Sequence, residues 1–269
     1  GTGGNGDITL TSGAAIAWTS GNSLTLEADR SITLTTGSSI TSTLGSITLN
    51  ADRSITLTTG SSITSTLGSI ALNANTTGTA SGAFEGITLT GATVRTNAGS
   101  ITLVGQGGDE ASGNFLHGIV LDQGSLIESQ GIGGGLGTIT LQGTGGTGNF
   151  DNVGVRIEDT AIIRTQDAPV VITGEGAGTG SRNHGVSVVN GTIESLSGAT
   201  ITVQGIATSS GEGVEVSNNS LIRSQNGDIT ITGTGGIGGT DHGILFGSGG
   251  QVYSSSAGVV TITGSASGG

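Results

Sequence analysis

Residues 45–57 read Gly-Ser-Ile-Thr-Leu-Asn-Ala-Asp-Arg-Ser-Ile-Thr-Leu, and the triplet Ile-Thr-Leu occurs in them twice. Each triplet places a polar residue between two apolar ones, which is the alternation of a β-strand with one buried face. Similar triplets recur along the whole chain in nine groups of three, separated by Gly, Ser, Asn or Asp. One group is too small to bury its own apolar residues. The repeat therefore predicts a solenoid whose units stack on one another.

The triplets can be aligned by their first residues. The first triplet of each unit begins at Ile8, Ile32, Ile55, Ile87, Ile119, Val155, Val186, Val214 and Ile244. The second begins at Ile16, Ile40, Ile63, Val94, Ile127, Ile163, Ile193, Ile222 and Val252. The third begins at Leu24, Ile47, Ile70, Ile101, Ile139, Val170, Ile201, Ile229 and Val260. We predict an all-β fold, a right-handed parallel β-helix (β-solenoid) of about nine coils with three short strands per coil. At about 4.8 Å per coil the rod would be roughly 43 Å long.

We expect residues 1–269 to form a single β-solenoid, and to be a segment of a longer protein. Residues 1–81 contain short coils of about 23 residues, and residues 82–269 contain longer coils of about 30 residues. The extra residues fall mainly between the third strand of one coil and the first strand of the next, as in 105–116, 143–152 and 174–184. Insertions at one corner project from one edge, either as a binding edge or as solvated spacers.

The composition restricts the partners that this chain can have. The net charge is −12, which disfavours binding to nucleic acid or to anionic membrane surfaces. There is no cysteine, so disulfides, thiol catalysis and thiolate-bound zinc are excluded. No apolar run approaches the roughly 18 residues of a membrane span, so we predict no membrane insertion.

A ladder of alternating charge follows the second triplets. Their middle residues in successive units are Arg95, Glu128, Arg164, Glu194 and Arg223, followed by Tyr253. Opposite charges stacked across neighbouring strands stabilise the pairing by a few tenths to about 1 kcal/mol each when exposed. We interpret this as a structural charge ladder that specifies register, with an ionic ligand surface as the alternative.

The middle residues of the third triplets form a threonine ladder, which includes Thr25, Thr48, Thr102 and Thr140. Stacked threonines suit a pleated surface because their β-branched side chains pack well there. A flat array with two threonines per rung would also suit ice binding. The second threonine is seen late in the chain, as in Thr232, so ice binding is a minor alternative.

Three histidines precede the glycine that opens a first triplet: His117, His184 and His242. That glycine is expected to supply positive φ or space at a corner. The histidines lie two coils apart, about 9–10 Å, which is too far for shared metal ligands at about 2.1 Å from one ion. We predict that they bind local backbone groups at the corners.

Calcium is the candidate cofactor that the sequence offers, and otherwise we expect none. Residues 3–8, Gly-Gly-Asn-Gly-Asp-Ile, resemble the opening of the calcium-binding nonapeptide of secreted toxins, with one residue missing before Asp7 and no tandem copy. Asp109 supplies a further acidic oxygen in a loop. Asp7 and Asp109 are therefore the calcium candidates.

An enzyme of the polysaccharide lyase or glycosidase type is a further alternative. Such an enzyme needs clustered carboxylates on one outward face. The middle residues of the first triplets are almost devoid of titratable groups, and the aromatic residues are scattered in the sequence. We assign no catalytic residue and predict that the chain is not an enzyme.

Two stretches resemble repeats of the filamentous-haemagglutinin-like bacterial adhesins: Gly45–Arg53, and the unit from His184-Gly185-Val186-Ser187-Val188 to Val203. The resemblance implies a secreted or cell-surface bacterial protein, with this chain as a non-enzymatic, structural or adhesive segment in a stiff stalk or extracellular fibre. It implies end-to-end continuation or self-association, with glycans or cell surfaces as partners. If the long-loop edge binds a ligand, we expect the residues involved to be His117, Asp151, His184 and Asp241.

Overall fold

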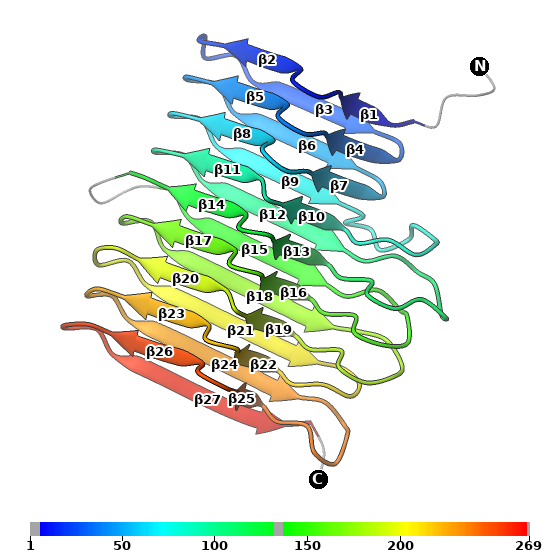
Figure 1. Cartoon of the computed structure of the whole chain (residues 1–269), viewed down its shortest axis with the longest axis vertical. Coiled ribbons are helices and arrows are strands. Elements are labelled where there is room, and N and C mark those ends of the chain that lie inside the picture. The colour runs from blue at the N-terminus through cyan, green and yellow to red at the C-terminus, as the bar shows by residue number, and fades with distance from the viewer. Residues whose placement is uncertain (1–5, 132–136, 268–269) are drawn as a thin grey trace.

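The chain folds as a parallel β-solenoid of about nine coils, with three strands in each coil (Figure 1). The computed structural model describes residues 6–131 and 137–267. Its strands cycle through three nine-stranded parallel sheets, so each strand pairs with strands one coil away in the chain. The predicted fold class is confirmed. The described residues include no helix able to cross a lipid bilayer.

The first sheet contains β1 (Ile8–Leu10), β4 (Ser31–Leu34), β7 (Ser54–Leu57), β10 (Ile87–Thr90), β13 (Ile119–Asp122), β16 (Val155–Glu158), β19 (Val186–Val189), β22 (Val214–Ser217) and β25 (Ile244–Phe246). The second contains β2 (Ala15–Trp18), β5 (Ser39–Ser42), β8 (Ser62–Ser65), β11 (Thr93–Thr96), β14 (Leu126–Ser129), β17 (Ile162–Thr165), β20 (Thr192–Ser195), β23 (Leu221–Ser224) and β26 (Gln251–Ser254). The third contains β3 (Leu24–Ala28), β6 (Ile47–Ala51), β9 (Ile70–Ala74), β12 (Ile101–Gln106), β15 (Ile139–Thr144), β18 (Val170–Gly176), β21 (Ile201–Ala207), β24 (Ile229–Gly235) and β27 (Val260–Ala266).

The strand register agrees with the alignment of the triplets. Every predicted first residue pairs with the predicted first residue of the neighbouring coil, in all three sheets. The stacked isoleucine, leucine and valine side chains form one continuous buried cluster. Alternation therefore determined both the strand positions and their pairing.

The interior also contains a column of hydroxyl groups. Most strands of the second sheet end in a serine or threonine that points inward, two residues after the buried apolar residue. In successive coils these residues are Ser42, Ser65, Thr96, Ser129, Thr165, Ser195 and Ser224, and all are buried. Several of these hydroxyls bind backbone groups of the next corner; for example, the Gly45 amide donates to Ser42 Oγ at 2.9 Å. The column satisfies polar groups that the tight corner would otherwise leave buried without partners.

A glycine seam joins the third and first sheets in the longer coils. From β12 onward the third strands have six or seven residues and continue past the corner. There two glycine columns face each other: Gly105, Gly143, Gly174, Gly205 and Gly233 against Gly118, Gly154, Gly185, Gly213 and Gly243. A Cβ on Gly205 would lie 1.9 Å from the Gly213 carbonyl oxygen. The glycines before the first strands provide this space and do not have positive φ.

The long loops lie where the sequence predicted them, between third and first strands. The turns at residues 29–30 and 52–53 have two residues, whereas the corresponding connections in later coils include 75–86, 107–118 and 145–154. The predicted loop segments began two or three residues too early, because the third strands continue to residues 106, 144 and 176.

Candidate functional site

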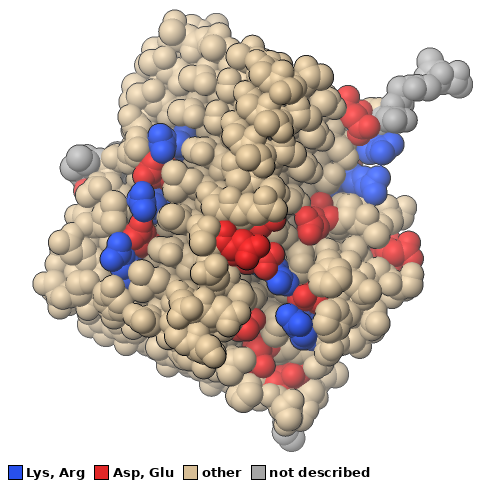
Figure 2. Space-filling model, viewed as in Figure 1, with Lys and Arg blue, Asp and Glu red and all other residues tan. Residues whose placement is uncertain are grey.

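The charge ladder is formed as predicted, on the second sheet. Register pairs Arg95 with Glu128, Glu128 with Arg164, Arg164 with Glu194, and Glu194 with Arg223. The ion-pair distances are 2.7 Å from Arg95 Nε to Glu128 Oε2 and 2.5 Å from Arg164 Nε to Glu194 Oε1. Arg223 Nη2 lies 2.6 Å from Glu194 Oε2. Figure 2 shows the acidic and basic side chains alternating in single file down one side of the molecule.

The ladder is more buried than an ordinary surface salt bridge. The side chains of Glu128 and Glu194 are only 10% and 3% exposed, while the arginines are between 35% and 41% exposed. Burial raises the pKa of Glu194, but hydrogen bonds from Arg164 and Arg223 outweigh burial, so its pKa lies below the ordinary value. Removal of one partner of such a buried pair is therefore expected to cost more than removal of one partner of an exposed pair.

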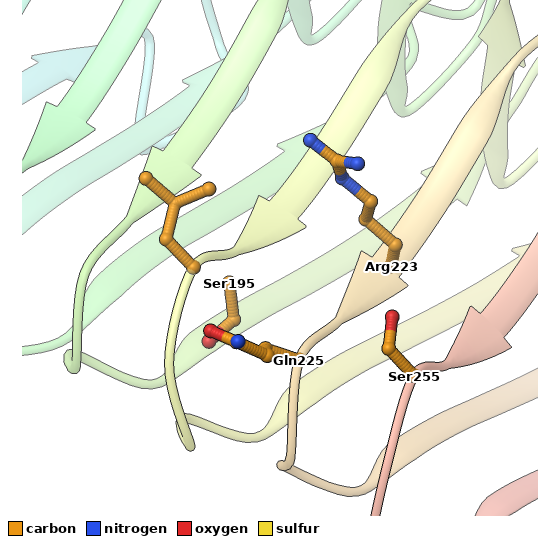
Figure 3. A pocket seen from close by; sticks show the side chains of 5 residues that line it. Ser195, Arg223, Gln225 and Ser255 are labelled. Atoms are coloured by element: carbon orange, nitrogen blue, oxygen red, sulfur yellow. The ribbon is translucent and has the colours of Figure 1, made fainter.

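A small pocket opens beside the last arginine of the ladder (Figure 3). It has a volume of about 260 Å³ and is lined by Ser195, Leu196, Arg223, Gln225 and Ser255. Because the Arg223 guanidinium is already held by Glu194, this pocket offers an incoming ligand little free charge.

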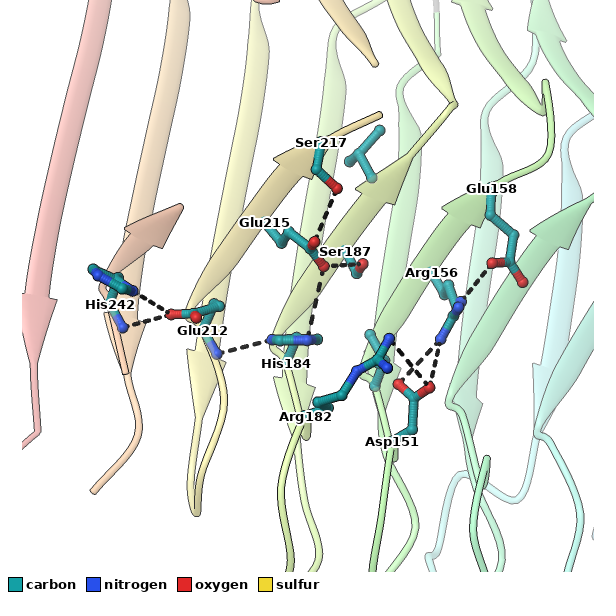
Figure 4. A network of polar contacts seen from close by, with 12 residues as sticks. Asp151, Arg156, Glu158, Arg182, His184, Ser187, Glu212, Glu215, Ser217 and His242 are labelled. Carbon is teal, nitrogen blue, oxygen red and sulfur yellow. Dashed lines mark hydrogen bonds and ion pairs between the residues drawn. The ribbon is translucent and has the colours of Figure 1, made fainter. Parts of the chain in front are cut away.

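A polar network covers the loop edge and the adjoining face of the first sheet (Figure 4). At its centre the Arg156 guanidinium donates to both carboxylate oxygens of Asp151 at 3.0 Å. Arg156 Nε also donates to Glu158 Oε2 at 2.8 Å. Asp151 is 2% exposed, and Arg182 Nη2 approaches its Oδ2 at 3.9 Å. One arginine thus binds two carboxylates, one supplied by a loop and one by a strand.

Two of the three histidines bind backbone groups at the corners, as predicted, whereas His242 Nδ1 lies 3.2 Å from a carboxylate oxygen, Glu212 Oε2. The Val153 amide donates to His117 Nδ1 at 3.1 Å, and the Glu212 amide donates to His184 Nδ1 at 2.9 Å. Burial lowers the pKa of His117 to about 3, and it also lowers the pKa of His184. Both rings are therefore neutral at physiological pH.

Three of the four predicted loop-edge residues lie close together. The charge of Asp151 influences the pKa of both His117 and His184. Asp241 lies apart from them, near the last described coils, where it accepts from the Gly238 amide at 2.8 Å and from Ser210 Oγ at 3.3 Å. The predicted loop edge therefore contains one cluster, formed by His117, Asp151 and His184, and a separate residue, Asp241, that binds groups of its own loop and of the preceding one.

The two calcium candidates lie in different coils and have protein partners. Asp7 Oδ1 accepts from the Ser31 amide at 3.1 Å and lies 3.5 Å from Arg30 Nε. Asp109 accepts from the Thr147 hydroxyl. Residues 3–5 of the nonapeptide-like stretch lie outside the described residues. Across residues 6–131 and 137–267, no group of three or more His, Asp or Glu side chains could hold a metal ion.

A carboxylate row on the first sheet was missed from the sequence. The fourth residues of these strands also face outward, and those of β13 and β16 are Asp122 and Glu158. Glu85 lies beside them and accepts from the Thr88 hydroxyl at 2.6 Å. Burial raises the pKa of Glu85 and of Asp122. The expectation of a face almost without titratable groups, which considered the middle residues alone, is wrong here.

Strained backbone accompanies the loop-edge cluster. Phe115, Asp151 and Arg182 have φ of 59°, 56° and 63°, a left-handed conformation that side chains rarely adopt. The Phe115 ring is about half exposed and meets the Phe150 ring edge to face, with centroids 6.0 Å apart. Two of the scattered aromatic residues are therefore brought together by loops of adjacent coils.

No family model matches this chain. Nor does any curated protein or solved structure.

Acidification is expected to destabilise the fold through His117. Since its pKa is about 3 in the fold and 6.5 in the unfolded chain, the unfolded state binds more protons between these values. Lowering the pH from 6.5 to 5 should therefore lower the free energy of unfolding by about 2 kcal/mol. Urea unfolding of wild type and His117→Asn at both pH values would measure this effect. The Asn Oδ1 can still accept from the Val153 amide, but it does not titrate.

A matched control is His242→Asn, because the His242 side chain is 58% exposed. His117→Asn should reduce the pH dependence of the wild type more than His242→Asn does. Equal slopes for wild type and His117→Asn would contradict a neutral, buried His117.

Proposed function

We propose that this chain is a stiff, non-enzymatic segment of a secreted or cell-surface bacterial protein, and that it forms part of an adhesive stalk or extracellular fibre. The observation that carries the proposal is the unbroken register of three parallel sheets through nine coils. A rod whose coils all pair with their neighbours transmits load through many backbone hydrogen bonds. The charge ladder supports the proposal, because it opposes slippage of one coil against the next.

The partners proposed for this rod are a further coil at either end and glycans or neighbouring cell surfaces along its side. β27 is exposed along its length, with Ile262 46% exposed. The outer edges of β1, β2 and β3 are likewise not paired within the described residues. Open strand edges of this kind pair readily with another strand, supplied by the same chain or by a second copy.

The test adds coils and measures length. Inserting four extra copies of residues 31–53 after Arg53 reproduces the native junction, because Arg53 then precedes Ser31 just as Arg30 does. Each copy should lengthen the rod by about 4.8 Å, so the variant should be about 19 Å longer. Small-angle scattering and electron microscopy would measure the maximum dimension and the cross-section.

The control replaces the inserted coils with a Gly/Ser-rich segment of equal length, which should behave as a flexible chain. The proposal requires an unchanged cross-section and a straight particle for the coil insertion alone. Growth in width, or bending equal to that of the Gly/Ser control, would contradict a stiff rod.

A carbohydrate-active enzyme is the second candidate, and the carboxylate row of Glu85, Asp122 and Glu158 favours it. The rod is preferred because Arg156 already binds Glu158 and because Glu85 binds Thr88. Assays for new reducing ends and for unsaturated products should be run on neutral and acidic polysaccharides, with Asp122→Asn as the control. Turnover that this variant abolishes would replace the rod proposal with an enzymatic one.

A further inference from the structure

A groove lies at the step where the short coils meet the first long loop. It has a volume of about 520 Å³ and is lined by Asp29, Arg30, Asp52, Arg53, Thr77, Thr79, Ala80 and Ser81. Asp29 and Arg30 form the turn before β4, and Asp52 and Arg53 form the turn before β7. The hydroxyl residues belong to loop 75–86, which projects from the next coil (Figure 1). The change in repeat length therefore produces a concave site between turns and loop.

The charges of this groove are arranged differently from those of the ladder. Ser31 pairs with Ser54, so Arg30 lies over Arg53 and Asp29 over Asp52, about one coil spacing apart. Like charges stacked in this way destabilise strand pairing, whereas the ladder alternates their sign. This chain thus contains alternating charges in the ladder and stacked like charges in the groove, and the stacked like charges are the less favourable arrangement.

The arginines of the groove are available to a ligand. The Arg53 guanidinium lies over the Phe84 ring, 4.7 Å from its centroid, and no carboxylate among the described residues forms an ion pair with it. Within residues 6–131 and 137–267, the one ion pair of Arg30 is the long 3.5 Å contact with Asp7, and the Arg30 side chain is 45% exposed. Stacking holds Arg53 in place without neutralising its charge.

The lining defines the chemistry of the ligand. Two guanidinium groups favour a carboxylate or sulfate group. Two carboxylates repel a purely anionic ligand but accept hydrogen bonds from hydroxyl groups. The Thr77, Thr79 and Ser81 side chains add hydroxyls that can donate or accept. A saccharide whose sugar units each have one acidic group and several hydroxyls satisfies all of these groups together.

We propose that this groove binds a uronic-acid saccharide, with the sugar carboxylate on Arg30 and Arg53 and sugar hydroxyls on Asp29 and Asp52. The volume lies within the range of small-molecule sites. This inference goes beyond the rod proposal and is separable from it, because rod length does not depend on the groove.

Calorimetric titration of the full chain with trigalacturonate tests the proposal, with galactotriose as the neutral probe and diglycine as the zwitterionic probe. Trigalacturonate should bind with a Kd below about 1 mM, and galactotriose at least tenfold more weakly. Arg53→Gln should weaken trigalacturonate binding at least tenfold. Arg182→Gln, another exposed arginine away from the groove, should leave it unchanged.

Unfolding midpoints of both variants should match that of the wild type, which separates lost binding from lost folding. No saturable binding of trigalacturonate up to about 5 mM, five times the expected limit, would overturn the proposal. So would equal affinity for galactotriose, an unchanged affinity of Arg53→Gln, or tighter binding of diglycine, which would indicate a zwitterionic ligand.

Discussion

Reversing one charge of the ladder, Glu128→Arg, is expected to lower the free energy of unfolding by about 3–5 kcal/mol. The substitution removes a carboxylate that is only 10% exposed and stacks three guanidinium groups, at residues 95, 128 and 164. It also removes the acceptor for the Gln130 side-chain amide, which donates to Glu128 Oε2 at 2.9 Å. Urea unfolding at neutral pH and low salt would measure the loss.

Glu175→Arg is the matched control, because Glu175 also lies outward within a central strand, between Thr144 and Ile206, but is exposed and has uncharged neighbours in register. Its effect should stay within about 0.5 kcal/mol. Equal losses for the two variants would show that the ladder contributes no more than an ordinary surface charge.

A methyl group in the glycine seam, Gly205→Ala, is expected to cost about 3 kcal/mol, the upper end of ordinary overpacking. The new Cβ would lie 1.9 Å from the Gly213 carbonyl oxygen, and that atom belongs to backbone that is itself hydrogen-bonded to neighbouring coils. No side chain can rotate to relieve this contact. Thermal and urea unfolding of the purified variant would measure the cost.

Gly198→Ala provides the comparison for this variant. A Cβ on Gly198 would meet no atom within 4 Å, and its φ is not in the left-handed range. We expect a change within about 0.5 kcal/mol. A stability of Gly205→Ala equal to that of Gly198→Ala would mean that the third and first sheets can separate at the seam without loss.

The strand positions and register were predictable because alternation has a strict period of two. A slip of one residue at Ile127, for example, would expose it and bury Glu128 fully. The charge ladder followed from the same alignment, since its members occupy one outward position. The corner role of His117 and His184 was also predictable, because each lies next to the glycine that opens a strand.

The remaining parts of the fold and of the candidate site could not be predicted, because they depend on residues that do not follow the repeat. The serines that point inward at the second corner are polar, so alternation alone does not reveal that they are buried. Asp122 and Glu158 were missed because their strands extend one residue beyond the triplet. The cluster of Asp151, Arg156 and Arg182 requires left-handed loop residues, and no local pattern in the sequence specifies that conformation.

The glycine seam has a consequence for how such a gene can change in length. Both seam columns change from another residue to glycine between the third and fourth coils. Gly105 occupies the position that Ala74 has one coil earlier, and Gly86 occupies the position that Ser54 has one coil earlier. Unequal recombination between two short repeats yields a coil that packs against its neighbours as before. Recombination between a short and a long repeat would instead place alanine or serine side chains against the backbone of the seam. Natural isolates should therefore differ in the number of short repeats, and segments 37–51 and 60–74, which are identical except for Thr48 and Ala71, have the form that such an exchange produces.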